Sequence, residues 1–399
     1  MNPKLLLQLA QQILPQTIQW RRALHQMPEI GLELPKTVAY VCGVLDELGI
    51  EYDSHYVEGN GIVALIHGER PANKVLALRA DMDGLPIQED TGLDFASTNG
   101  AMHACGHDAH TAVLLSVAAI LSQHRDQFAG TVKLIFQPGE EYPGGALPMI
   151  KEGALENPRV TRIYGMHQGQ LDSQQPEGTI GLIEGPMMAS MDRFLIEVQG
   201  KGYHGAYPEL SHDPIVATGQ LITALQTIKS RNISAFDPSI LSITRVQGGF
   251  NQNIIPDTVE LEGTVRTYSN QLRENIHQRI QGIADGIAQA FDVQCKVTYD
   301  YKYPAIMNTP EAVEETHQVL EEVLGEDALY TLPQPLMSSE DFAFYLEEVP
   351  GAFIYLSNPG HIEGQFHGHH HPQFDINEDY LELAIQTFLA LTLDYLKTL

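Results

Sequence analysis

Residues 102–111 read Met-His-Ala-Cys-Gly-His-Asp-Ala-His-Thr and gather three histidines, one cysteine and one aspartate within ten positions. Cys105 and His107 are two residues apart, so an extended backbone would direct both side chains to one face. A thiolate and an imidazole together suit zinc or a similar transition metal. The apolar run 111–121 follows and favours a buried helix. The stretch predicts a metal-ligand loop leading into a helix, with a free buried cysteine beside capping residues as the alternative.

Short apolar runs on both sides of this loop predict the strands of one sheet. They cover residues 75–80, 131–136 and 162–166, and a helix separates the first two. That alternation is typical of an α/β fold with a doubly wound, mostly parallel sheet. Ligand sites in such sheets lie beyond the carboxyl ends of the strands. The side chains that follow these ends are therefore expected to converge with the loop; they are Asp81, Asp83, Glu140, Glu141 and His167.

The flanking segments extend this architecture. An amphipathic helix is predicted over residues 2–26, and Pro15 should kink or break it. The other predicted elements are a helix at 35–48, a strand at 61–67, a helix at 310–324, a strand at 352–356 and a helix at 379–396.

From about Met187 the pattern changes to strand, helix, strand, strand, helix, strand, which is the order of a ferredoxin-like α+β domain. The predicted strands are 191–199, 239–247, 258–267 and 293–299, and the predicted helices are 211–229 and 271–291. We therefore predict a discontinuous domain of residues 1–186 and 303–399, interrupted by an inserted domain of residues 187–302.

The charge and cysteine content limit the class of protein. The 399 residues include 23 Lys and Arg against 51 Asp and Glu, a net charge of −28. Such a surface repels nucleic acid and anionic membranes, although solubility alone accounts for it. Three cysteines argue against a disulfide framework and suit a reducing compartment. No signal peptide and no apolar stretch of membrane-spanning length is evident, so we expect a cytoplasmic protein without nucleic-acid or membrane partners.

Taken in order, the motifs resemble those of the zinc- or manganese-dependent aminoacylase/carboxypeptidase amidohydrolases. The branch of hippurate hydrolases, N-acetyldiaminopimelate deacetylases and plant auxin-conjugate hydrolases is the most similar, over nearly the whole chain. The markers are residues 22–29, 78–86, 103–110, 137–141, 165–167, 339–342 and 370–374. The resemblance implies a zinc-peptidase-like catalytic domain, a lid or dimerisation role for the insertion, and a homodimer or homotetramer.

The resemblance also implies a site with two divalent metal ions, zinc or manganese, with cobalt or nickel as further options. Cys105 would be the bridging thiolate. The other ligands would be His107, Glu141, His167 and His370, the last being the histidine two positions before Pro372. Glu140 would be the general base, and Asp83 would orient a metal ligand.

The inserted domain would contribute to substrate binding. By the same resemblance, His204 and Asn253 would reach the substrate, His204 often across a dimer interface. Ala109 and Gly205 stand where this branch more often has Gly and Ala, and neither difference removes a functional group. Arg266 could bind a substrate carboxylate or form a structural ion pair, so it is left outside the predicted site.

The implied reaction is hydrolysis of an N-acyl-amino acid to a carboxylic acid and a free amino acid. Glu140 would take a proton from the attacking water and deliver it to the leaving nitrogen. In an extended backbone Glu140 and Glu141 would point apart, so one could bind metal while the other faced substrate.

Three other functions remain open at this point. A dipeptidase or carboxypeptidase could use the same metal site. A cysteine amidase with Cys105 as nucleophile and His107 or His110 as base would leave the carboxylates without a role. A protein that only binds metal or peptide would have no use for Glu140 and Asp83.

Overall fold

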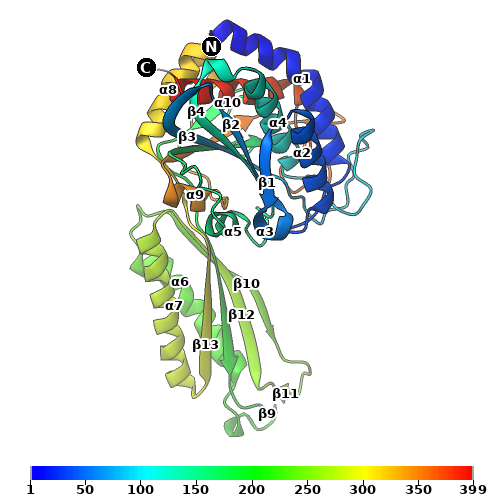
Figure 1. The fold of residues 1–399 in the computed structure, drawn as a ribbon. Helices are drawn as coiled ribbons and strands as arrows, with labels where there is room; N and C mark the ends of the chain where they lie inside the picture. The colour runs from blue at the N-terminus through cyan, green and yellow to red at the C-terminus, as the bar shows by residue number, and fades with distance from the viewer. Residues whose placement is uncertain (1, 398–399) are drawn as a thin grey trace. The chain divides into compact units, whose positions relative to one another are not determined.

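The computed structural model describes residues 2–397 (Figure 1). The chain divides into two compact units. The first comprises Met1–Met187, Met307–Leu336 and Glu340–Leu399, and the second Met188–Ile306 and Met337–Ser339. Among the described residues, none of the helices combines the length and the apolar character that a membrane crossing requires.

The first unit is built on an eight-stranded sheet with the order β1-β2-β4-β3-β5-β16-β6-β15. The strands are β1 (Glu51–His55), β2 (Gly61–His67), β3 (Arg70–Asp81), β4 (Ala129–Gln137), β5 (Arg162–Gly169), β6 (Ile180–Leu182), β15 (Leu329–Thr331) and β16 (Gly351–Ser357). The central strands β4, β3, β5 and β16 pair in parallel, whereas β1, β2 and β4 pair antiparallel. Every residue of β4 and β16 is buried. The predicted mostly parallel sheet is confirmed.

Helices of the first unit pack on this sheet and on one another. They are α1 (Pro3–His25), α2 (Pro35–Glu47), α3 (Tyr56–Gly59), α4 (His107–Gln123), α5 (Ala146–Lys151), α8 (Pro310–Leu324), α9 (Ala343–Glu348) and α10 (Leu381–Tyr395). Helices α1, α4 and α10 contact one another, and α4 also contacts β3 (Figure 1). Residues 107–121 of α4 are all buried, so the helix is covered on every side and does not present one face to water.

The predicted break at Pro15 is wrong, because α1 runs without interruption from Pro3 to His25. Pro15 is exposed, so the carbonyl that loses its helical partner there can bond to water. The opposite face of α1 buries Leu6, Ala10 and Leu24. Packing of that face against α4 and α10 outweighs the one missing hydrogen bond.

The second unit contains a four-stranded antiparallel sheet with the order β10-β12-β8-β13. Its elements are β8 (Met191–Gln199), α6 (Pro214–Thr227), β10 (Ser239–Gly248), β12 (Thr258–Thr267), α7 (Asn270–Phe291) and β13 (Gln294–Tyr303). Alternate residues of β12 are buried, as expected for a sheet that has helices on one face. Phe194, Leu221 and Ile276 belong to a core that joins β8, α6 and α7. The predicted ferredoxin-like order of elements is confirmed.

Short elements complete the described chain. They are β7 (Gly185–Met188), β9 (Tyr203–His204), β11 (Ile254–Ile255), β14 (Ile306–Asn308), β17 (His361–Ile362), β18 (Gln365–Phe366), a π-helical turn at Ile228–Asn232 and 3-10 turns at Arg125–Gln127, Pro208–Leu210, Glu326–Ala328 and Glu378–Tyr380.

Candidate metal centre

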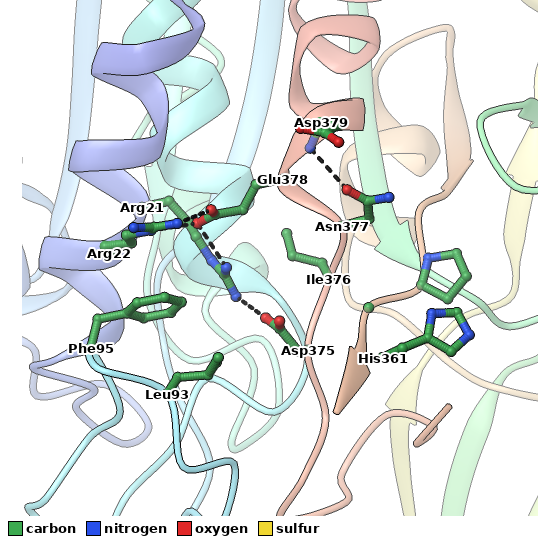
Figure 2. A pocket seen from close by; sticks show the side chains of 12 residues that line it. Arg21, Arg22, Leu93, Phe95, His361, Asp375, Ile376, Asn377, Glu378 and Asp379 are labelled. Atoms are coloured by element: carbon green, nitrogen blue, oxygen red, sulfur yellow. Dashed lines mark hydrogen bonds and ion pairs between the residues drawn. The ribbon is translucent and has the colours of Figure 1, made fainter. Parts of the chain in front are cut away.

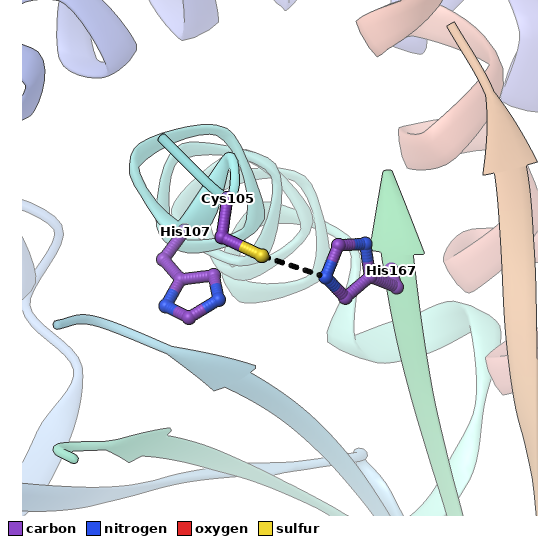
Figure 3. A group of neighbouring side chains, drawn as sticks. All are labelled: Cys105, His107 and His167. Carbon is purple, nitrogen blue, oxygen red and sulfur yellow. Dashed lines mark hydrogen bonds between the residues drawn. The ribbon is translucent and has the colours of Figure 1, made fainter. Parts of the chain in front are cut away.

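Cys105 and His107 are brought together by a sharp turn at the start of α4. Gly106 has φ of +85°, in the left-handed region that favours glycine, and His107 is the first residue of the helix. The predicted extended backbone is therefore wrong, although the two side chains still converge. The Cys105 Sγ lies 3.4 Å from the His167 Nε2 (Figure 3). Donor atoms of Cys105, His107 and His167 all lie within 4.8 Å of one another.

Asp83 connects the start of α4 to the loop after β4. Its Oδ1 lies 3.3 Å from the Nδ1 of His107. Its two oxygens also accept the backbone N–H groups of Glu140, at 3.0 Å, and Glu141, at 3.1 Å. The buried Nε2 of His107 makes no hydrogen bond, so its lone pair can bind a cation when Nδ1 carries the proton. This geometry fits the orienting role predicted for Asp83.

The two carboxylates that follow β4 face the same site. Glu140 and Glu141 lie in a turn after Gly139, which has φ of +66°. The prediction that they point apart from an extended backbone is wrong. Each offers an oxygen within 4.8 Å of the other and of a ring nitrogen of His107. Glu140 is 6% exposed, and Glu141 is half-buried.

His167 and His370 approach the centre from two further segments. His167 lies inside β5, not after it, and its Nδ1 donates to the Gln168 carbonyl at 2.9 Å. That bond leaves the Nε2 lone pair directed at Cys105. His370 has φ of +65°, an uncommon value for a residue with a side chain. Its N–H donates to the Ala104 carbonyl at 2.8 Å, and its Nε2 lies 3.0 Å from an oxygen of Glu141.

The charges of this cluster favour a bound cation. Burial, followed by the charges of Glu340 and Glu141, raises the pKa of Glu140 well above its usual range. Burial and the nearby carboxylates likewise raise the pKa of the Cys105 thiol. Burial opposes the charged form of His107, but Asp81 and Asp83 outweigh it and raise the pKa to about 10. One thiolate with imidazole and carboxylate donors fits zinc or a similar transition ion.

A buried arginine supports the loop that carries the two glutamates. Arg79 forms ion pairs with Asp81, Glu340 and Asp341 at 2.7 to 3.0 Å. Asp341 also accepts from the Gln137 side chain, at 2.9 Å, and from the backbone N–H of Ala146, at 2.9 Å. It therefore ties both ends of the loop together. Glu340 and Asp341 were not among the predicted site residues, although both belong to one of the quoted motifs.

A second arginine, Arg21 on α1, ties the metal-ligand loop to the C-terminal part of the first unit. It forms an ion pair with Asp108 at 2.9 Å. It also pairs with Asp375 at 2.6 Å and with Glu378 at 3.0 Å (Figure 2). The hollow beside it has a volume of about 400 Å³ and is also lined by Arg22. Because Asp108 follows His107, this network fixes the first turn of α4.

The two predicted substrate contacts lie in the second unit. His204 is exposed in β9, and its Nδ1 accepts the backbone N–H of Ala206 at 3.1 Å. Asn253 precedes β11, which pairs with β9. Arg266 donates to the Ser339 hydroxyl at 2.8 Å. The structure thus groups the five predicted ligands, Glu140 and Asp83 in the first unit, and His204 with Asn253 in the second.

Comparison with known proteins identifies the family. Residues 77–394 match the model of peptidase family M20/M25/M40. The chain belongs to this family. N-acetylcysteine deacetylase of Bacillus subtilis is 40% identical over 383 residues, which cover 96% of this chain and 97% of the relative. Thermostable carboxypeptidase 1 of Saccharolobus solfataricus is 36% identical over 371 residues, which cover 92% of each chain.

A solved structure of the same family matches closely. It is a Bacillus subtilis protein described as a dinuclear metal-binding peptidase from the M20 family. It has a TM-score of 0.83 and 36% sequence identity, and the match covers 98% of this chain and 100% of that protein. As an M20 member, the chain is a metal-dependent hydrolase of amide or peptide bonds, as the sequence motifs predicted.

Proposed function

We propose that this M20 hydrolase cleaves the amide bond of N-acyl-amino acids, releasing a carboxylic acid and a free amino acid. The observation that carries the proposal is the grouping of Glu140 with the donor atoms of His107 and Glu141 within 4.8 Å. It combines a proton carrier with groups that can bind metal. The 40% identity with a relative named for deacetylation of N-acetylcysteine supports the N-acyl class.

The proposed cofactor is a pair of divalent ions, zinc or manganese, with cobalt or nickel as further options. The residues that would hold them are Cys105, His107, Glu141, His167 and His370. When bound, such ions supply Lewis acidity, which lowers the pKa of water from about 15.7 toward 7.

Glu140 would carry the proton through the reaction. It would accept a proton from the attacking water and donate it to the nitrogen that leaves as the amine. Asp83 would hold the backbone of Glu140 and the ring of His107 in fixed relative positions.

A peptidase is the second candidate. The same residues could hydrolyse a dipeptide or remove a C-terminal residue, and a relative named as a carboxypeptidase is 36% identical to this chain. The two candidates differ in the group on the acyl side of the scissile bond, not in the residues that perform hydrolysis.

A substrate panel separates the two candidates. The metal-reconstituted protein is incubated with N-acetyl-, N-benzoyl- and N-indoleacetyl-amino acids and with unmodified dipeptides, and the released amine is measured. Release from the acylated set that stops after chelation supports the proposal. Release from dipeptides alone would replace it with a peptidase function. Glu140→Gln is the matched inactive control, because it removes the proton carrier and keeps the shape of the side chain.

The inserted unit is proposed to form a homodimer or homotetramer and to supply His204 and Asn253 to the substrate. Strand β10 lies at an edge of its sheet, and Val246 on it is 51% exposed. Mixing Glu140→Gln chains with His204→Ala chains should restore activity if His204 acts in the neighbouring subunit. Mixed dimers that remain inactive would contradict that arrangement.

A cytoplasmic location is proposed from the low cysteine content.

A further inference from the structure

His369 is a half-buried ring beside the centre that the proposed ligand set does not use. Its Nδ1 lies 3.7 Å from the Cys105 Sγ. On the other side of the ring, Nε2 lies 3.3 Å from the hydroxyl of Tyr355. Tyr355 belongs to β16 and is fully buried. The ring thus lies between a thiol and a phenol, one at each nitrogen.

The direction of these two contacts follows from the burial of Tyr355. Its hydroxyl is fully buried and cannot donate to water. The hydroxyl proton therefore needs an acceptor within the protein. The acceptor that the structure offers is the Nε2 of His369. A neutral imidazole that accepts at Nε2 carries its proton at Nδ1, which faces the sulfur of Cys105.

We propose that Tyr355 and His369 are positioning residues that donate a hydrogen bond to the Cys105 thiolate when metal is bound. The inference rests on the proposed function, in which Cys105 is a metal ligand. A hydrogen bond to a ligand atom orients that atom and withdraws electron density from it. The thiolate would then bind the ions less covalently and leave them stronger Lewis acids.

The packing around His369 fixes the ring in this place. The rings of His167 and Phe374 lie 5.1 Å and 4.8 Å from it, centroid to centroid. Gly169 is a further neighbour, and a Cβ at that position would lie 2.3 Å from the His369 ring. Any residue larger than glycine at 169 would therefore displace the ring, so the lack of a side chain there leaves room for His369 against Cys105.

Cobalt(II) reports on the sulfur directly, because a thiolate bound to this ion gives a sulfur-to-metal charge-transfer band. Full-length protein is loaded with Co²⁺, and stoichiometry, affinity and the band are compared among variants. His369→Leu removes the donor and should move the band to lower energy, with two Co²⁺ retained and affinity reduced about 10- to 100-fold. His369→Asn keeps an N–H donor near the position of Nδ1 and should restore the wild-type band.

Tyr355→Phe removes only the hydroxyl and should shift the band in the same direction by a smaller amount. Tyr345→Phe is the matched control, because Tyr345 is equally buried and its hydroxyl contacts the Met149 sulfur, at 3.8 Å, instead of a histidine. An unshifted band in both His369→Leu and Tyr355→Phe would overturn the proposal. Loss of one Co²⁺ from His369→Leu and His369→Asn would overturn it as well, by making His369 a ligand.

Cys105→Ala separates failure of this inference from failure of the proposed centre. The band should vanish in this variant. A band that persists would remove Cys105 from the ligand set, and the proposed centre would fail together with the hydrogen bond to it. A band that vanishes in Cys105→Ala but is unmoved in the His369 variants would refute the hydrogen bond alone.

Discussion

Replacing His25 with glutamine should remove a pH-dependent contribution to the stability of the first unit. His25 is fully buried, with Nδ1 2.8 Å from Asp108 and Nε2 3.1 Å from Glu89. Burial disfavours its charge, but Asp108 and Glu89 outweigh burial and raise the pKa from 6.5 to about 9. A pKa change of this size corresponds to a contribution of about 3 kcal/mol at most to the free energy of unfolding.

The direction of this pH dependence follows from whether the folded or the unfolded chain binds the His25 proton more tightly. The folded state holds the proton on His25 up to about pH 9, whereas the unfolded chain releases it near 6.5. The stabilisation is therefore complete below pH 6.5 and is lost as the pH rises through 9. The wild type should lose more stability over this window than His25→Gln, whatever the difference between them at low pH.

The single tryptophan allows this pH-dependent loss of stability to be measured. Trp20 lies on α1, five residues before His25, and is 9% exposed. Its fluorescence during urea unfolding, at several pH values in the presence of a chelator, gives the free energy of unfolding around α1. His317→Gln is the control, because His317 is on the exposed face of α8 in the same unit. Parallel pH profiles for wild type and His25→Gln would refute the reasoning.

Three further outcomes are expected at the metal centre. Glu140→Gln should lower turnover about 10²- to 10⁴-fold while metal content, measured by atomic emission, stays at the wild-type value; loss of metal would place Glu140 among the ligands. Cys105→Ala should lose bound metal, and a variant that keeps two ions would exclude a bridging thiolate. Asp83→Ala removes the acceptor for His107 and for two backbone N–H groups. Its metal affinity, measured by chelator competition, should fall about 10- to 100-fold, and unchanged affinity would contradict the orienting role.

The grouping of side chains at the metal centre was predicted from the sequence. The backbone conformation that brings them together was predicted less accurately. The strand pattern placed Glu140 and His167 at one edge of the sheet, because parallel strands end at a common edge. The predicted extended geometry failed at Cys105 and His107, where a left-handed glycine turns the chain. Two-residue spacing indicates a shared face only when the backbone is a strand, and a single Gly between two ligands does not reveal which conformation it takes.

Long-range polar contacts escaped prediction for a different reason. Arg79 meets Asp341 more than 260 positions later in the chain, and no local pattern encodes that pairing. The run 361–371 contains five histidines, and no local pattern in the sequence separates His369 from the others. Only the folded chain distinguishes the ring that meets Cys105 from those that do not.

The position of His370 in the chain has a consequence for biosynthesis. Cys105 and His107 leave the ribosome early, whereas His370 follows more than 260 positions later. Two carboxylates that pair with Arg21, those of Asp375 and Glu378, follow later still. At about 5–20 residues per second, that interval is on the order of 10 s or more. During it the nascent chain presents a thiol and imidazoles without the residues that enclose them. Metal acquired then would be held by an incomplete set, so stable loading should follow translation instead of accompanying it.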